Sequence, residues 1–131
     1  DKLESLSDTR YLRGVCYYHL NRMDDALRDF AMHALKNPRE PNAKFYAYYG
    51  LTHLHKKQLS LANRHVRKAY ALNSTDGLVL LSMGCLASQQ NKPQEALIWL
   101  RKAFATRQLD ADTIRKEEDM LRSVKSGSTY K

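Results

Sequence analysis

Four spaced positions recur together three times along this chain, and this repetition constrains the fold more than any other feature. In each copy a glycine is followed twelve residues later by an alanine. The step from Gly14 to Gly50 is only slightly longer than the step from Gly50 to Gly84. A period of about 34 residues predicts a solenoid of helix-turn-helix units, because each unit buries its apolar face only against its neighbours. The copies are Gly14, Tyr17, Ala26 and Phe30; Gly50, His53, Ala62 and Val66; and Gly84, Ala87, Ala96 and Leu100.

The small residues of this skeleton determine how closely paired helices can approach. The glycine lies on the first helix of each pair and the alanine lies on the second. Larger side chains at these positions would force the two backbones apart. We therefore expect a close crossing within every helix pair.

Length and composition are those of one compact domain. The 131 residues are 43% hydrophobic, which excludes wholesale disorder, and no apolar run approaches the ~18–20 residues of a membrane span. Cys16 and Cys85 fall in different repeats, which favours a reducing compartment, and we expect a cytoplasmic location. The chain begins with Asp1 rather than Met, so we expect its native N-terminus, with any targeting signal, to be missing.

The chain is basic, with 22 Lys and Arg residues against 14 acidic residues and a formal charge of +8. This balance favours acidic proteins, nucleic acid or anionic lipid as partners. Many basic proteins are simply soluble, so charge alone does not choose among these partners.

Three helix hairpins followed by one further helix account for the whole pattern. Ser7 or Asp8 is expected to cap the first helix, and Asn21 and Asn91 are expected to adopt a left-handed backbone just past helix ends. The predicted helices cover residues 8–20, 24–36, 43–56, 59–72, 77–90, 93–106 and 110–124. They form a single domain at 1–125, with repeats at about 7–40, 43–76 and 77–109, a capping helix at about 110–124 and a flexible tail at 126–131.

The predicted last helix has the character of a cap. Asp110 to Asp112 can begin it, and a helix that is polar on its outer side would shield the last repeat. Its apolar stripe consists of Ile114, Met120, Leu121 and Val124.

The skeleton resembles the tetratricopeptide repeat, whose pattern is a large apolar residue, Leu-Gly, Tyr, Ala, an aromatic residue, Ala and Pro. The resemblance covers residues 8–108 and implies an all-α, right-handed superhelical solenoid of three antiparallel helix hairpins with a C-terminal capping helix. Arg10 and Arg13 replace large apolar residues of the first repeat, so we expect the array to start there. The matching residues are Gly14, Tyr17, Ala26, Phe30 and Pro38; Tyr46, Gly50, Ala62 and Ala69; and Leu80, Met83, Gly84, Ala96, Leu100 and Ala103.

The resemblance implies that the first helices line a concave groove that holds a peptide. An aromatic and apolar groove suits an amphipathic helix or an extended segment with hydrophobic anchors. The alternative is that several of the tyrosines pack between helices and the groove stays empty. The predicted groove residues are Tyr11, Val15, Tyr18, Lys44, Tyr48, Leu51, His55, Leu78, Leu81, Ser82 and Cys85.

One subclass of the family clamps a C-terminal carboxylate with Lys and Asn at set groove positions. Those residue types are absent from the matching positions here, so tails of heat-shock chaperones are poor candidates. The matching positions hold Tyr11, Val15, Tyr48, Leu78 and Ser82.

The second helices would expose a basic convex face. This face is either a ridge for phosphates or an acidic protein, or an ordinary solvated surface, which we favour. No aromatic side chains are interleaved with the bases, which argues against single-stranded nucleic acid. The basic positions are Arg28, Arg64, Arg67, Lys68, Arg101 and Lys102.

The sequence predicts no catalytic site, metal site or cofactor. His53 and His55 are two residues apart on one helix and would point in different directions, and neither cysteine lies at a ligand spacing. Glycine-rich phosphate loops, nucleophile elbows and His-Glu metal motifs are absent from the sequence.

These observations favour a non-enzymatic adaptor that holds a partner peptide or helix in the concave groove. One alternative is a chaperone similar to those of bacterial secretion systems, which shield a hydrophobic protein segment; the basic charge argues against it, because those chaperones are usually acidic. The other alternative is binding of an anionic surface through the convex face. The partner and the oligomeric state stay open.

Overall fold

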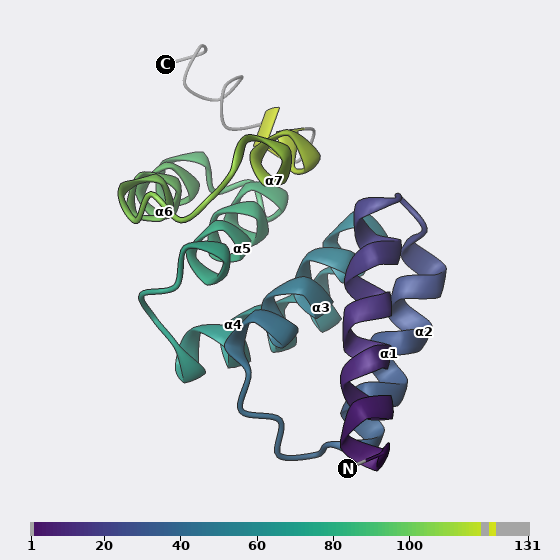
Figure 1. Ribbon diagram of the computed structural model, residues 1–131. Helices are drawn as coiled ribbons and strands as arrows, with labels where there is room; N and C mark the ends of the chain where they lie inside the picture. The colour runs from purple at the N-terminus through teal and green to yellow at the C-terminus, as the bar shows by residue number, and fades with distance from the viewer. Residues whose placement is uncertain (1, 119–120, 123–131) are drawn as a thin grey trace.

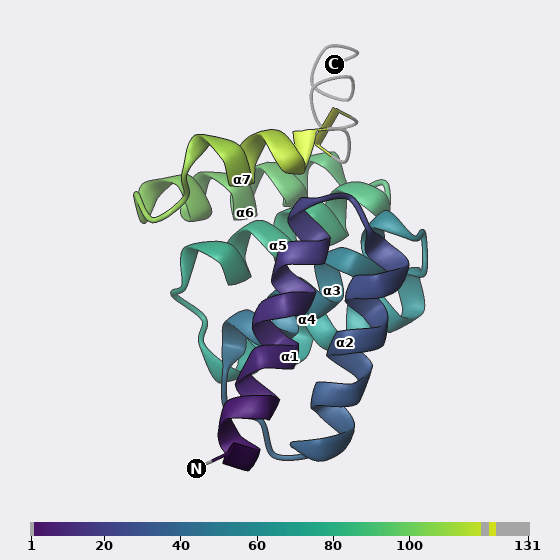
Figure 2. The same cartoon turned by 45° about the vertical axis from the view of Figure 1, so that its right-hand side comes forward.

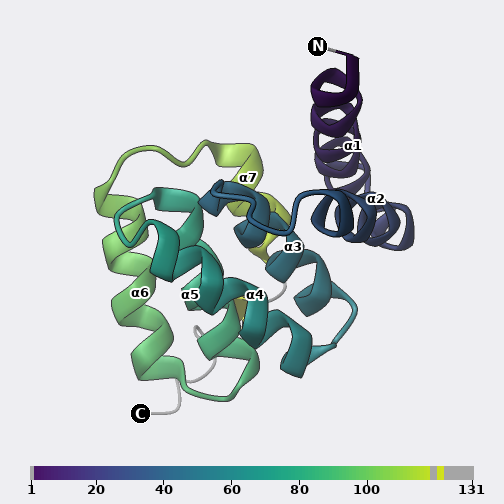
Figure 3. The ribbon, with the colours of Figure 1, turned by 90° about the horizontal axis from the view of Figure 1, so that it is seen from below.

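Three antiparallel helix hairpins stack in chain order and are followed by a short helix (Figure 1). The computed structural model describes residues 2–118 and 121–122, with side chains from residue 9 onward. Seen from below, α1 and α2 form one end of the stack and α6 lies at the other (Figure 3). Within the described residues the helices are α1 (Lys2–His19), α2 (Met23–Lys36), α3 (Ala43–His55), α4 (Leu59–Leu72), α5 (Gly77–Gln89), α6 (Pro93–Ala105) and α7 (Ala111–Lys116).

Helix limits from α2 to α6 agree with the sequence prediction to within one residue at each end. The predicted start of the first helix is wrong. Helix α1 already begins at Lys2, so Ser7 and Asp8 lie inside it and do not cap it. The physical reason is that residues 2–8 contain neither Pro nor Gly, and Lys, Leu and Glu are good helix formers.

The last helix begins where the sequence predicted but is shorter. The Asp110 side chain caps α7 by accepting a hydrogen bond from the Thr113 backbone N–H at 2.7 Å. The helix ends at Lys116 and Glu117 forms a turn; of the residues described after it, Glu118, Leu121 and Arg122 are helical. Met120, Val124 and the predicted tail at 126–131 lie outside the described residues.

The expected close crossing within each hairpin is confirmed. A Cβ atom at Gly50 would lie 2.4 Å from Val66 Cγ2 and 3.1 Å from the Val66 backbone nitrogen. A Cβ atom at Gly14 would lie 2.5 Å from the ring of Phe30. Only glycine therefore lets the first helix of a pair settle against the second.

The turns inside the hairpins share one backbone device. Asn21 and Asn91 have positive φ angles of 63° and 61°, as expected, and Lys57 adopts the same conformation at the equivalent position with a φ of 61°. Asn tolerates this left-handed geometry well, whereas Lys carries the steric cost of its Cβ.

Aromatic rings join the first hairpin to the second. Phe30 of α2 meets Phe45 of α3 edge-on at 5.7 Å between ring centroids, and Tyr18 of α1 meets Tyr48 of α3 at 5.4 Å. Phe30, Phe45 and Tyr18 are fully buried. Edge-to-face contacts of this kind add to the burial of apolar area and hold the two repeats together.

Arg13, one of the polar positions of the first repeat, is accommodated by charge pairing. Arg13 of α1 donates two hydrogen bonds to the carboxylate of Asp29 on α2, at 2.7 and 2.8 Å. Asp29 is buried, while the Arg13 side chain stays 56% exposed. An arginine at this position therefore serves the α1–α2 contact while facing solvent.

Changing Gly50 to Ala should destabilise the fold through the α3–α4 crossing. We expect Gly50→Ala to lower the free energy of unfolding by about 2 kcal/mol, because the new methyl group collides with Val66. Val66→Ala alone should cost about 2 kcal/mol through the space it leaves. The double variant should lose about 1 kcal/mol less than the sum, as measured by urea unfolding. Strictly additive losses would show that the two side chains do not meet.

Candidate functional site

The first helices do not expose a continuous groove. Helix α5 is buried along almost its whole length because α3, α4 and α6 surround it. Of the predicted groove residues, Lys44 is exposed, and Tyr11, Val15, Tyr48 and His55 are half-buried. The remaining predicted positions are each less than a tenth exposed: Tyr18, Leu51, Leu78, Leu81, Ser82 and Cys85. For Tyr18, the interpretation that the ring packs between helices is correct.

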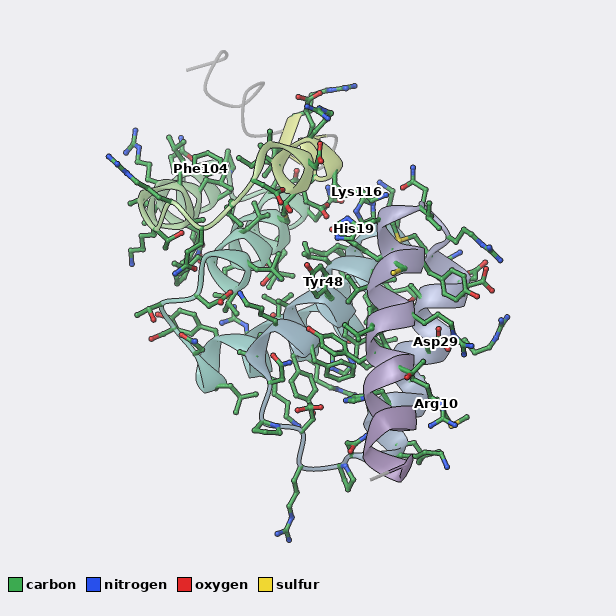
Figure 4. All side chains as sticks on the ribbon, viewed as in Figure 1. Arg10, His19, Asp29, Tyr48, Phe104 and Lys116 are labelled. Carbon is green, nitrogen blue, oxygen red and sulfur yellow. The ribbon has the colours of Figure 1, made fainter. Side chains whose placement is uncertain are left out.

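The open part of the concave face is a cavity of about 610 Å³ where α1, α3 and α7 meet. Tyr48 of α3 forms its floor, with its ring 6.0 Å from that of His19 on α1. Figure 4 shows Tyr48, His19 and Lys116 gathered at this junction. The cavity is lined by His19, Asn21, Tyr48, Asp110, Asp112, Thr113, Arg115 and Lys116.

Lys116 ties α7 to the first hairpin. Its ammonium group donates a hydrogen bond to the side-chain oxygen of Asn21 and lies 3.5 Å from the carbonyl oxygen of His19. The same group lies 5.5 Å from the centre of the Tyr18 ring, a cation–π distance. Residues nearly one hundred positions apart in the sequence therefore form one wall of the cavity.

A buried pair ties the residue after α7 to the second hairpin. Glu117 is fully buried, and its Oε2 lies 2.8 Å from Nε2 of His55 on α3. Its other oxygen, Oε1, has no hydrogen-bond partner among the described residues. Burial raises the pKa of Glu117 from 4.5 to about 8, because the carboxylate loses its hydration.

The cavity contains charges of both signs. Asp112 and Arg115 of α7 form an exposed ion pair at 2.9 Å. Hydrogen bonds from Thr113 lower the pKa of Asp110. Burial, and then the charge of Lys116, lower the pKa of His19. The site can therefore offer hydrogen-bond donors and acceptors to a polar segment, with a neutral imidazole at its edge.

The far end of the concave face is more apolar. Tyr11 of α1 packs edge-on against Phe45 at 5.6 Å, and burial raises its pKa to about 12. Lys44 pairs with Asp76, which also caps α5 by accepting a hydrogen bond from the Val79 N–H at 3.1 Å. Lys44 is therefore exposed but already paired.

No family model and no curated protein matches this sequence. A solved structure does match its shape: the first TPR of Spaghetti (RPAP3) bound to the HSP90 peptide SRMEEVD. The two structures agree with a TM-score of 0.69 over 94% of this chain and 93% of that one, at 15% sequence identity. The fold is that of a tetratricopeptide-repeat domain. The predicted helical solenoid is confirmed.

The cavity residues supplied by α7 were missed by the sequence prediction, which treated this helix only as a cap. The signal was present in the tetratricopeptide period. Ser82 follows Tyr48 by one full repeat, and Lys116 follows Ser82 by the same interval. Lys116 therefore occupies the groove position of the helix that continues the array.

All six residues predicted for the convex face are exposed. Several have neighbours that hold them in place: Lys68 lies over the ring of Tyr46 at 4.6 Å, and Lys102 lies over Trp99 at 5.0 Å. Arg28 forms an ion pair with Asp25 at 3.0 Å. The bases are therefore accessible, but these three have local partners.

His53 and His55 lie in different surroundings. His53 stacks on His65 at 5.2 Å, while His55 turns to Glu117, so the expected divergence of His53 and His55 is confirmed. Burial lowers the pKa of His65 to about 4. In the described part of the chain no three His, Cys, Asp or Glu side chains are grouped to hold a metal ion. No helix there is long and apolar enough to cross a membrane.

The buried Glu117 should make stability depend on pH. The pKa of Glu117 in the folded state lies above its ordinary value. The contribution of this group to the free energy of unfolding is therefore complete below about pH 4.5 and is lost as the pH rises to about 8. We expect wild type to lose at least about 1 kcal/mol of unfolding free energy relative to Glu117→Gln between about pH 6 and about pH 8.5. Urea unfolding at each pH measures this difference. Glu118→Gln, next to it but exposed, should show no such change; a parallel change would contradict the assignment.

Proposed function

We propose that this chain is a non-catalytic scaffold that binds a segment of a partner protein on its concave face. The observation that carries the proposal is the 610 Å³ cavity between α1, α3 and α7, which opens beside the half-buried ring of Tyr48. The cavity is lined by the ring of Tyr48 and otherwise by polar and charged side chains, which can orient a bound segment through hydrogen bonds. The solved neighbour with this fold is bound to a peptide, which supports the same class of ligand here.

The expected ligand has two parts with different chemistry. An apolar anchor would lie along Tyr11, Val15 and Tyr48, which are half-buried and retain surface on this face. A polar end would enter the cavity, where Lys116 donates hydrogen bonds and Asp110 accepts them. An extended segment, or one turn of an amphipathic helix, satisfies both requirements.

The neighbour's peptide, SRMEEVD, is acidic, and we propose that this chain selects a different segment. The positions that match a carboxylate clamp include Val15, which is half-buried and apolar, and Leu78 and Ser82, which are buried. None of these side chains carries a cation to neutralise a terminal carboxylate. Lys44, the only lysine predicted for the groove, pairs with Asp76, and Lys116 of the cavity donates a hydrogen bond to Asn21.

Peptide display on the immobilised full chain tests the proposal. We expect selected peptides to share one or two large apolar residues, and Tyr48→Ala to weaken their binding about tenfold by removing the floor of the site. Arg67→Ala, on the convex face, should leave binding unchanged. Fluorescence anisotropy with a selected peptide measures both variants. A substitution at Leu81 is unsuitable, because that side chain is fully buried and its loss would disturb the fold.

Salt separates this function from binding through the convex face. Apolar groove binding should change little between low and physiological ionic strength, whereas binding to the bases of α2, α4 and α6 should weaken steeply. Equal binding by wild type and Tyr48→Ala, together with a steep salt dependence lost in Arg67→Ala, would transfer the function to the convex face.

A further inference from the structure

A second hollow lies on the other side of α7, away from the concave cavity. Helices α6 and α7 run side by side (Figure 2), and between them is an apolar cleft of about 320 Å³. Phe104 of α6 is 45% exposed in it, and Figure 4 shows this residue well apart from His19, Tyr48 and Lys116. The cleft is lined by Leu97, Leu100, Arg101, Phe104, Ile114, Glu118 and Leu121.

The α7 side of the cleft corresponds to a known packing face. Ile114 lies one repeat after Leu80, and Glu118 lies one repeat after Gly84. Helix α5 uses this face to hold α6, since a Cβ atom at Gly84 would lie 2.8 Å from Leu100 Cδ2. The side of α7 that lines the cleft therefore corresponds to the side of α5 that packs against α6.

The α6 side of the cleft corresponds to the surface through which the second helix of one repeat contacts the second helix of the next repeat. Phe104 lies one repeat after Tyr70 of α4. Tyr70 packs edge-on against Trp99 of α6 at 5.3 Å. An aromatic residue of a further second helix would therefore pack against Phe104 as Trp99 packs against Tyr70. Among the described residues no helix lies beside Phe104 in this way.

We propose that this cleft is a docking site for an amphipathic helix of a partner protein, seated as the second helix of a fourth repeat. The seat continues the register of the α3–α4 and α5–α6 interfaces, and it differs from them at one position. Gly50 and Gly84 allow a close crossing in the earlier repeats. The equivalent position after α7 is Glu118, which is exposed. A docked helix must therefore place a basic residue opposite Glu118, because an apolar one would bury an unpaired carboxylate.

The second side of the cleft adds a further requirement. Arg101 of α6 and Glu118, which follows α7, both line the cleft. The partner helix therefore has an apolar face with an aromatic residue, an acidic residue on the edge near Arg101 and a basic residue facing Glu118. A second copy of this chain does not fit, since its own second helices place Phe30, Val66 and Leu100 opposite the glycine position.

A peptide derived from α6 itself provides the probe. It is a dye-labelled 13-residue peptide with the sequence of residues 93–105 carrying Leu100→Lys, and its control is the unsubstituted peptide. We expect the full chain to bind the Lys peptide about tenfold more tightly than the control, because only the Lys peptide pairs with Glu118. Glu118→Ala in the full chain should reverse this preference. Fluorescence anisotropy measures all four combinations.

Two variants on α6 locate the probe. Phe104→Ala should weaken binding of the Lys peptide about tenfold. Ile98→Ala, on the same helix, exposed and outside the cleft, should have no effect. Tyr48→Ala should also have no effect, so failure of this proposal and failure of the concave-face proposal are distinguishable. Circular dichroism checks that each variant is folded.

Several outcomes would overturn the proposal. Equal affinity for the two peptides, or unchanged binding by Phe104→Ala, would show that the probe does not sit in the cleft. A full chain with Val124→Ser and Tyr130→Ser that binds the Lys peptide tenfold more tightly would identify the chain's own C-terminal residues as the occupant. Sedimentation showing a dimer that Phe104→Ala dissociates would identify a second copy.

Discussion

The contact between Gly50 and Val66 brings the backbones of α3 and α4 so close that no methyl group fits between them. The same contact recurs at Gly14 with Phe30 and at Gly84 with Leu100. Because each crossing is so close, the large side chains around it are forced outward, where they meet the next hairpin. The aromatic contacts between α1 and α3, and between α4 and α6, follow from this geometry. The residues that recur in each repeat therefore serve to pack the helices together.

Helix α7 gives the molecule its two distinct surfaces. Lys116 reaches Asn21 of the first hairpin and Glu117 reaches His55 of the second, so the segment crosses the concave side. This crossing narrows the groove to a cavity with polar walls. The opposite side of α7 lies beside α6 without closing on it, which leaves an apolar cleft. One short helix therefore continues the array on one face and leaves a place for a second helix on the other.

The proposed binding surfaces show how far residue patterns carry a prediction. Tyr48 keeps surface beside the cavity, whereas Ser82, one full repeat later on α5, is buried. Periodicity tells which side of a helix a residue occupies, but not whether another element covers that side. Helix α5 is covered because it lies in the middle of the stack, between α3, α4 and α6.

By itself the sequence determined the helices from α2 to α6, their turns and the close crossings within each hairpin. These features depend on contacts within a single repeat and on backbone sterics at particular residues such as Gly50 and Asn91. Only the tertiary structure decided where α7 lies and which groove positions keep any surface. His55 and Glu117 are 62 residues apart, and a contact of that range is fixed by the summed geometry of all the intervening helices rather than by any local pattern.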